Sequence, residues 1–414
     1  MQKIVFTVTN DITYDQRMQR ICTSVAETGF EVWLIGRKLS TSTPLPSFNF
    51  RTKRLSCFFN KGFAFYAEYN IRLFFYLFFS KAHCLCAIDL DTIVPVYFVS
   101  WLKNIQRVYD AHELFTEQKE IVTRPKVHKI WMAIEQFCVP RFKQGYTVNL
   151  FIKDELHRRH GVNYGVVRNM PLKVEGLGGE VEGRSEKIED RREEIEGGGK
   201  KVEGKRENLG DDRLQMTDNE FGNTSTASLI PNNQFLIYQG AVNEGRSFET
   251  LIPAMKQVNC TLLICGEGNF FEQTKQLIQQ HDLADKIILK GYVSPIELKK
   301  ITPKAILGLT LFEKTGLNQY YSLSNRFFDY IMAGIPQVCV GYPEYKAIND
   351  EHEIALLIDE TDEQTIANSI NRLINDTTLH KQLQQNCIQA RTVLNWNNEA
   401  NKLKQFWKEI MQAR

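Results

Sequence analysis

The stretch SLSNRFFDYIMAGIP, residues 322–336, decides the fold, and the apolar run QVCVG follows it directly. Ser324 is a good helix N-cap, whereas Gly334 and Pro336 are typical of a helix end, so the pattern predicts a short helix that leads into a buried strand. In such a unit the helix N-terminus faces the ligand edge of the sheet, where free backbone N–H groups can bind an anion. Asp329, one turn inside, could accept hydrogen bonds from sugar hydroxyls. The stretch therefore suits a nucleotide diphosphate, and the alternative is an ordinary capped helix with a solvated Asp.

Short apolar segments alternate with amphipathic segments along most of the chain. This alternation is typical of βα units that form a parallel sheet. It occurs in two series, so the sequence predicts an α/β fold with two doubly wound, Rossmann-like domains that face each other across a cleft, with the ligand at the carboxyl ends of the strands. The predicted strands are residues 3–8, 31–36, 84–89, 107–112 and 146–149 in the first series, and 235–240, 261–266, 286–291, 306–311, 336–340 and 354–359 in the second.

Residues 173–227 separate the two series and differ from them in composition. They mix Glu, Lys, Arg and Gly with a single aromatic residue, Phe221. So little apolar surface cannot offset the entropy of the chain, which predicts a disordered, charged insertion without chemistry of its own. The sequence then divides into a first domain at residues 1–170, a second domain at residues 229–393, and an amphipathic helix at residues 394–414 that we expect to pack back on the first domain.

The composition is that of an ordinary globular protein, with 43% hydrophobic and 24% charged residues. A formal net charge of +2 gives no reason to expect nucleic acid as a partner. Nine cysteines lie mostly in apolar segments, a pattern of free thiols in a reducing compartment. Cys84 and Cys86 share one strand face without a second ligand pair, which argues against a metal site. The opening residues read as a strand rather than a signal peptide, so we expect a cytoplasmic protein.

The most hydrophobic window, residues 63–79, is interrupted by Glu68, Asn70 and Arg72, so it is a poor membrane-spanning helix. Its aromatic residues would fit a helix that rests on an anionic membrane surface, and a buried amphipathic core helix is the alternative. The cations near this window are Lys53, Arg54, Lys61, Arg72 and Lys81.

Three further motifs carry candidate binding residues. In YQGAVNEGRSFETLI a strand ends at Gly240, and Arg246 precedes a helix, where its charge can face a diphosphate. In CGEGNF, Gly266 and Gly268 form a turn, but no third glycine completes a dinucleotide fingerprint. In YDAHELF, His112 follows a strand and could donate a hydrogen bond to a sugar hydroxyl or a phosphate oxygen. Arg246 also fits a solvated turn, and His112 also fits a structural role.

Together these stretches resemble the retaining family 4 glycosyltransferases (glycosyltransferase group 1), which have the GT-B fold, and especially bacterial members that act in surface polysaccharide synthesis. The resemblance covers nearly the whole chain except the insertion, and it rests on the order and spacing of the motifs. It implies that the first domain is the acceptor side and the second the nucleotide-sugar side. The matching stretches are TNDITYDQRMQRI, EVWLIGR, AIDLDT, YDAHE, RNMP, YQGAVNEGRSFETLI, GEG, GYVSPIELKKI, SNRFFDYIMAGIP and NWN.

The resemblance implies a role for individual residues. Asp329 stands where the family holds the donor's ribose, and Arg246 stands where a lysine holds the diphosphate. His112 matches the histidine placed against the donor sugar and phosphate. The expected catalytic residues are thus His112 and Arg246, and the expected donor-binding residues are Gly240, Gly266, Gly268, Ser324, Asn325, Arg326 and Asp329.

Two positions depart from the family pattern. Ala241 replaces an arginine that contacts the diphosphate in many members, and Tyr321 replaces an acidic residue that usually touches the donor hexose. Asn325 and Arg326, with Glu313 upstream, could compensate for these losses.

The function that the resemblance implies is transfer of a hexose from a UDP- or GDP-linked sugar to a glycan or lipid-linked acceptor, with retention, in surface polysaccharide or lipopolysaccharide synthesis. No cofactor is expected, and Asp89 to Asp91 are expected to form a strand-end turn rather than a metal site, so the enzyme should be metal-independent. The expected location is the cytoplasm, with contact at the inner membrane surface left open. A UDP-sugar 2-epimerase and a noncatalytic nucleotide-sugar-binding homologue are the alternatives.

Overall fold

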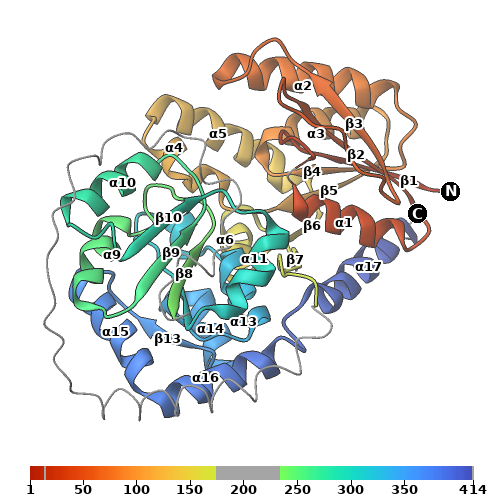
Figure 1. Cartoon of the computed structure of the whole chain (residues 1–414). Coiled ribbons are helices and arrows are strands. Elements are labelled where there is room, and N and C mark those ends of the chain that lie inside the picture. Colours follow the sequence, from red (N-terminus) through yellow and green to blue (C-terminus); the bar gives the residue numbers. More distant parts are fainter. Residues whose placement is uncertain (14, 174–233, 413–414) are drawn as a thin grey trace, which may run out of the picture. The chain divides into compact units, whose positions relative to one another are not determined.

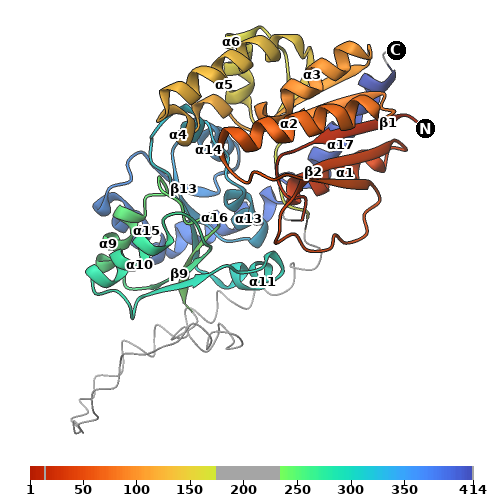
Figure 2. The same cartoon turned by 90° about the horizontal axis from the view of Figure 1, so that it is seen from above.

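The computed structural model describes residues 1–13, 15–173 and 234–412 of the chain. Residues 1–172 and 234–414 form one compact unit, which contains two parallel β-sheets with helices on both faces (Figures 1 and 2). The predicted α/β architecture is therefore confirmed. The insertion that we expect at residues 173–227 lies, from residue 174 onward, outside the described residues.

The first sheet has seven parallel strands in the order β3-β2-β1-β4-β5-β6-β7. Its order reverses between β1 and β4, where Ile4 pairs with Val32 on one side and with Cys84 on the other. The strands are β1 (Lys3–Thr7), β2 (Glu31–Lys38), β3 (Arg51–Ser56), β4 (Cys84–Ile88), β5 (Gln106–Ala111), β6 (Gln144–Thr147) and β7 (Gly165–Val166).

Each face of this sheet packs on a different set of helices. Ile4 and Phe6 of β1 point to the face covered by α1 and α17, whereas Val5 points to the face covered by α2, α3 and α6. The C-terminal helix α17 lies beside α1 (Figure 1). The ring of its Trp407 is 5.1 Å from that of Phe6. The helices are α1 (Gln16–Ala26), α2 (Gly62–Phe79), α3 (Ile93–Leu102), α4 (Lys119–Val122), α5 (Pro125–Cys138), α6 (Leu150–His160) and α17 (Trp396–Gln412), with short 3-10 turns at Leu90–Thr92, Phe115–Glu117 and Val139–Arg141.

The second sheet has six parallel strands in the order β10-β9-β8-β11-β12-β13, and its order reverses between β8 and β11. Its strands are β8 (Phe235–Gln239), β9 (Thr261–Cys265), β10 (Ile287–Gly291), β11 (Leu307–Thr310), β12 (Gln337–Val340) and β13 (Ala355–Ile358). Its helices are α9 (Phe248–Ala254), α10 (Phe271–Gln280), α11 (Pro295–Ile301), α12 (Leu317–Tyr320), α13 (Asn325–Ala333), α14 (Pro343–His352), α15 (Glu363–Asn375) and α16 (Thr377–Ala390), with 3-10 turns at Met255–Gln257 and Thr302–Lys304.

The helix predicted from residue 325 is α13. Gly334 ends it in the left-handed conformation with φ of 70°, and β12 follows directly, as the sequence indicates. Ser324 is the N-cap residue, but its side chain accepts no capping hydrogen bond.

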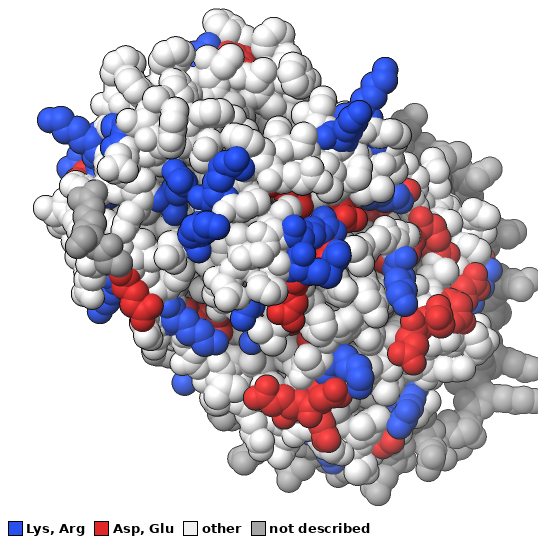
Figure 3. All heavy atoms as spheres, turned by 180° about the vertical axis from the view of Figure 1, so that it is seen from behind, with Lys and Arg blue, Asp and Glu red and all other residues white. Residues whose placement is uncertain are grey.

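The hydrophobic window at residues 63–79 forms α2, which has two apolar faces. Phe65, Tyr69 and Leu73 are buried in the core of the first sheet, whereas Phe63 and Phe75 on the outer face are 77% and 55% exposed. No helix within the described residues is long and apolar enough to cross a membrane. Charges of both signs are interspersed over the face of the molecule in Figure 3, in keeping with a net charge of +2.

Candidate active site

Glycines at the carboxyl edge of the second sheet allow the loops after β8 and β9 to touch. A Cβ atom on Gly266 would lie 1.8 Å from the carbonyl oxygen of Gly240, and one on Gly268 would lie 2.3 Å from that of Val242. Any side chain at either position would therefore force these two loops apart. Gly240 itself has φ of 116°, which favours glycine. The edge of the sheet near β8, where the strand order reverses, is thus built from backbone without side chains.

Two arginines meet beside this edge on a floor of aromatic rings. The guanidinium carbon of Arg246 is 4.3 Å from the ring centroid of Phe312, and that of Arg326 is 4.1 Å from Tyr238 and 5.3 Å from Phe312. Burial lowers the pKa of Arg246, and the positive charge of Arg326 lowers it further. A Cβ atom on Gly240 would lie 3.5 Å from Nη2 of Arg326, so the glycine brings bare backbone up to the guanidinium.

Neither arginine has an anionic partner among the described residues. Nε of Arg246 and Nη1 of Arg326 are buried, yet neither atom has a hydrogen-bond partner there. Buried cationic donors without acceptors are costly, because they have lost water and gained nothing in return. The two guanidinium groups therefore carry positive charge with which no described carboxylate forms an ion pair, and a diphosphate has the charge and the oxygens to neutralise it.

Arg326 itself belongs to the first turn of α13. The backbone N–H of Ser324 donates to the Tyr345 hydroxyl at 2.9 Å, so this group is not free for an anion as we expected. The N–H groups of Asn325 and Arg326 belong to the first turn, which has no intrahelical acceptors. Asn325 is exposed, and its Oδ1 accepts a hydrogen bond of 2.8 Å from Nδ2 of Asn169.

Asp329 lies one turn further along α13 and has one carboxylate oxygen engaged. Its Oδ2 accepts a hydrogen bond of 3.0 Å from Nε2 of Gln239, whose Oε1 in turn accepts one from Thr302 at 2.6 Å. Burial raises the pKa of Asp329 to about 6, although the Gln239 hydrogen bond and the charges of Arg20 and other cations oppose this rise. Its Oδ1 accepts no hydrogen bond from the described residues, so it can accept one from a hydroxyl.

His112 follows β5 at the carboxyl edge of the first sheet and is oriented by Asp89. The backbone N–H of His112 donates to Oδ1 of Asp89 at 2.8 Å, and the ring Nδ1 is 3.6 Å from Oδ2. Desolvation lowers the pKa of His112, but the hydrogen bond and charge of Asp89 raise it more, so that the net pKa lies above its ordinary value. The imidazole is 45% exposed and is therefore accessible to a ligand.

Asp89, His112 and Glu113 present ligand atoms within 4.8 Å of one another, which is a spacing that a cation could use. Both carboxylates already have other partners. Asp89 accepts from His112, and Glu113 accepts from Gln118 and, at 3.1 Å, from Nδ2 of Asn318 on α12. The cluster thus has a structural account as a support for the histidine.

Loops of the two sheets are held together around these groups. Asn318 Oδ1 accepts from the backbone N–H of Leu114 at 3.1 Å, and Lys119 Nζ lies 2.6 Å from Oε1 of Glu244 in the loop before Arg246. The structure thereby places His112 and the arginine pair on segments that contact each other.

The two positions that depart from the family pattern have other roles. The carbonyl oxygen of Tyr321 accepts a hydrogen bond of 2.6 Å from Asn149, and its ring stacks on Phe151 of α6 at 5.7 Å. The carbonyl oxygen of Ala241 accepts from the Tyr238 hydroxyl at 2.8 Å. The backbone N–H of Glu313 donates to Gly245 at 3.1 Å, so this residue holds the loop that carries Arg246.

Sequence reasoning did not find Arg20, Tyr238 or Phe312. The last two belong to apolar runs and look like ordinary core residues in the sequence. Arg20 lies on α1, more than 300 residues before Asp329, and only the fold brings its charge near that carboxylate.

Comparison with known proteins indicates a family for part of the chain and a fold for the whole. Residues 224–390 match the family described as Glycosyl transferases group 1. Sucrose-phosphate synthase from Thermosynechococcus elongatus has a similar structure, with a TM-score of 0.72, 15% identity and full coverage of both chains. Anabaena HepE in complex with UDP-glucose has a TM-score of 0.66 and 11% identity, and covers 99% of this chain and 100% of its own.

WaaG, a glycosyltransferase involved in lipopolysaccharide biosynthesis, has a TM-score of 0.66 and 12% identity, and covers 97% of this chain and 98% of its own. A search of curated proteins found no match. At these identities the solved structures establish the fold, while the family match establishes the kind of enzyme. Residues 224–390 therefore belong to the group 1 glycosyltransferases, enzymes that transfer a sugar from a nucleotide sugar, and the chain has the GT-B fold.

Proposed function

We propose that this enzyme transfers a hexose from a nucleotide diphosphate sugar to a glycan or lipid-linked acceptor, with retention at the anomeric carbon, in surface polysaccharide or lipopolysaccharide synthesis. The observation that carries the donor site is the pair of buried guanidinium groups without an anionic partner among the described residues, Arg246 and Arg326. The structural similarity to HepE, which was solved with UDP-glucose, and to WaaG, a glycosyltransferase involved in lipopolysaccharide biosynthesis, supports the donor class and the pathway.

In this proposal the arginine pair binds the diphosphate and stabilises its negative charge as the glycosidic bond breaks. Electrostatic stabilisation of this kind is worth about 2.7–4 kcal/mol for a single preorganised donor. Two fixed cations take the place that a metal ion has in other nucleotide-sugar enzymes, so we propose that turnover needs no metal. His112, held by Asp89, lies against the donor sugar and phosphate, where a protonated imidazole can donate a hydrogen bond.

The remaining donor contacts follow from the same edge of the second sheet. Oδ1 of Asp329 accepts from a ribose hydroxyl, and the bare backbone at Gly240, Gly266 and Gly268 lets the nucleotide approach closely. At the start of α13, the side chains of Ser324 and Asn325 face the phosphates. The backbone N–H groups of Asn325 and Arg326, which follow the N-cap, face them too. We assign residues 1–170 to the acceptor side and residues 229–393 to the donor side.

A thermal-shift series against UDP, GDP and their sugar conjugates tests the donor site. A ligand present at about 100 times its Kd adds roughly 2.7 kcal/mol of stability, which is readily measured. Stabilisation by one nucleotide family and its loss in Arg326→Ala would support the proposal. If no nucleotide stabilised the wild-type protein, the arginine pair would not be a diphosphate site. Proton NMR of the product formed with the selected donor would then show whether the anomeric configuration is retained.

Tyr321 favours one alternative, a noncatalytic nucleotide-sugar-binding homologue. Its ring and carbonyl group are used in contacts with α6, and it offers no carboxylate to the donor hexose. Such a protein would bind the donor in the thermal-shift series and yet neither transfer nor hydrolyse the sugar.

We also propose that the enzyme works at the cytoplasmic face of a membrane, because a lipid-linked acceptor would be held there. The outer face of α2 supports this: Phe63, Ile71, Phe75 and Phe79 are all more than half exposed. Exposed apolar side chains in such number on one helix are typical of a binding surface.

A further inference from the structure

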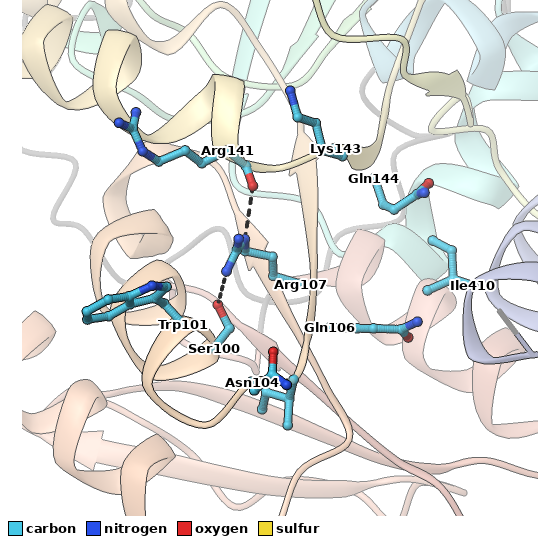
Figure 4. A pocket seen from close by; sticks show the side chains of 10 residues that line it. Ser100, Trp101, Asn104, Gln106, Arg107, Arg141, Lys143, Gln144 and Ile410 are labelled. Atoms are coloured by element: carbon cyan, nitrogen blue, oxygen red, sulfur yellow. Dashed lines mark hydrogen bonds between the residues drawn. The ribbon is translucent and has the colours of Figure 1, made fainter. Parts of the chain in front are cut away.

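A pocket lies at the amino-terminal ends of β5 and β6, at the opposite edge of the first sheet from His112 (Figure 4). Its volume is about 330 Å³. Arg107 occupies its centre, and its guanidinium donates to the carbonyl oxygen of Arg141 at 2.9 Å and to the hydroxyl of Ser100 at 3.1 Å (Figure 4). The remaining lining residues are Trp101, Asn104, Ile105, Gln106, Lys143, Gln144 and Ile410.

Three cations line this pocket, and none of them forms an ion pair with a carboxylate among the described residues. Arg107 is half-buried, while Arg141 and Lys143 are exposed and extend from the rim (Figure 4). Nη2 of Arg107 donates to no described residue, and Oε1 of Gln106 is buried without a partner there. The pocket therefore offers positive charge and an N–H donor without a partner among the described residues, which match a phosphate group.

Apolar side chains surround this basic pocket on the surface of the first domain. Trp101 and Leu102 at the end of α3 are 62% and 53% exposed, and Phe79 at the end of α2 is 78% exposed. Lys103 joins the two helix ends, since its Nζ donates to the carbonyl oxygen of Phe78 at 3.0 Å. Arg141 lies 4.1 Å from the ring of Phe137, which is itself partly exposed on α5.

A soluble phosphate would use the cations and leave this rim uncovered. A membrane surface would contact both the cations and the apolar rim, because anionic headgroups would lie at the level of the cations and the aromatic side chains would insert beside them. We propose that the Arg107–Arg141–Lys143 pocket binds the headgroup phosphate of an anionic phospholipid, and that Trp101, Leu102 and Phe79 enter the bilayer surface around it.

The pocket is separate from the donor site. β5 runs from Gln106 to Ala111, and at ~3.3 Å per residue its two ends lie roughly 16 Å apart. This inference rests on the proposed membrane contact, but it does not depend on the transfer reaction. The two can therefore fail independently.

Vesicle co-sedimentation tests the proposal. The wild-type protein should bind vesicles of phosphatidylcholine mixed with phosphatidylglycerol, and bind weakly to phosphatidylcholine alone. Each surface cation contributes about fivefold to such partitioning, so Arg141→Glu and Lys143→Glu together should reduce it at least tenfold. Both side chains are exposed, so the double variant should fold. The double variant Lys256→Glu with Lys275→Glu changes two exposed residues outside this surface, is the matched charge control and should bind like the wild type.

Trp101→Ala tests the rim and should weaken binding to anionic vesicles. The binding that remains should still decrease as the salt concentration rises, because the cations are unchanged. Val393→Ala, a 51% exposed residue outside this surface, is its control. Equal binding to neutral and anionic vesicles, or unchanged binding of the double variant, would overturn the proposal. Soluble glycerol phosphate that stabilises the protein while vesicles do not bind would assign the pocket to a free phosphate and would also overturn it. Stabilisation by nucleotides, measured on the same variants, reports the donor site separately.

Discussion

Replacing Asp329 with asparagine should make the free protein more stable and the donor complex weaker. Burial raises the pKa of this carboxyl from 3.8 to about 6, so folding opposes its ionised form. Asparagine has nearly the same shape, and its Oδ1 can still accept the hydrogen bond from Gln239, which is 3.0 Å long in the wild type. The substitution therefore removes the charge and keeps the packing.

The size of the effect follows from the shift in pKa. A rise of about two pKa units corresponds to roughly 3 kcal/mol at ~1.36 kcal/mol per unit. This is the largest increase in the free energy of unfolding that the neutral asparagine can give. Because the pKa is raised, the cost of ionisation is absent below about pH 4, where both the folded and the unfolded protein are protonated. It grows between about pH 4 and pH 6 and is complete above that. The variant should thus gain stability at pH 7.5 and none at pH 4.

Thermal unfolding at a series of pH values measures this difference. At roughly 2–4 °C per kcal/mol for a domain of this size, Asp329→Asn should melt up to about 10 °C higher than the wild type at pH 7.5. Asp285→Asn, an exposed aspartate in the loop after α10, should change the melting temperature little at any pH. A melting temperature of Asp329→Asn that stays equal to or below that of the wild type at pH 7.5 would show that the carboxylate is not strained by burial.

The same variant should bind the donor at least tenfold more weakly, since a hydrogen bond to a charged acceptor is worth about 1.5–3 kcal/mol. A residue that lowers the stability of the free protein and raises the affinity for the ligand is typical of a binding site. If stability rose but nucleotide affinity did not change, Asp329 would be a buried carboxylate without a role in donor binding.

Three further variants or treatments test other parts of the site. Arg246→Ala should lower kcat by about 10²–10³. Arg372→Ala, on the exposed face of α15, is the control. Near wild-type steady-state kinetics of Arg246→Ala would show that Arg246 has no part in the mechanism. Arg168→Met should lower the melting temperature, because it leaves the buried carboxylate of Glu344, 2.9 Å from Arg168, without its cation, and such losses cost about 3–5 kcal/mol. Treatment with EDTA should leave the initial rate of transfer unchanged, and restoration of a lost rate by Mn²⁺ would show that a metal is needed.

The sequence predicted most of the fold because parallel strands that are buried on both faces are uniformly apolar. All the predicted strands are present, and the order of apolar and helical segments gave two sheets. The sequence did not predict β3 (Arg51–Ser56), since RTKRLS is an edge strand with a polar composition and only β2 beside it. Hydrophobic pattern carries no signal for a strand of this kind.

The sequence suggests candidate residues for the site but not the contacts between them. His112 follows a strand, Arg246 precedes a helix and Asp329 lies one turn inside a helix, and such positions can face the carboxyl edge of a sheet. Their partners could not be found, because the contacts join residues far apart in the chain. The link between Asn318 and Glu113 spans 205 positions, and no local pattern specifies such a pair.

The arginine pair also bears on whether the missing family residues leave an active enzyme. Ala241 removes a cation from the loop after β8, but Arg326, on α13, reaches the same edge and stacks on Tyr238 at 4.1 Å. In the proposed donor site, the positive charge beside the phosphates would thus come from a helix instead of a loop. Tyr321 has no such substitute for its lost carboxylate, since its position is used for packing on α6. A protein that kept only nucleotide binding would have no reason to hold two like charges together with no ion-pair partner among the described residues, because a single arginine would bind a diphosphate at lower cost to folding. The second charge is useful where negative charge grows on the leaving group, so the pair favours catalysis, with a changed choice of sugar, over binding alone.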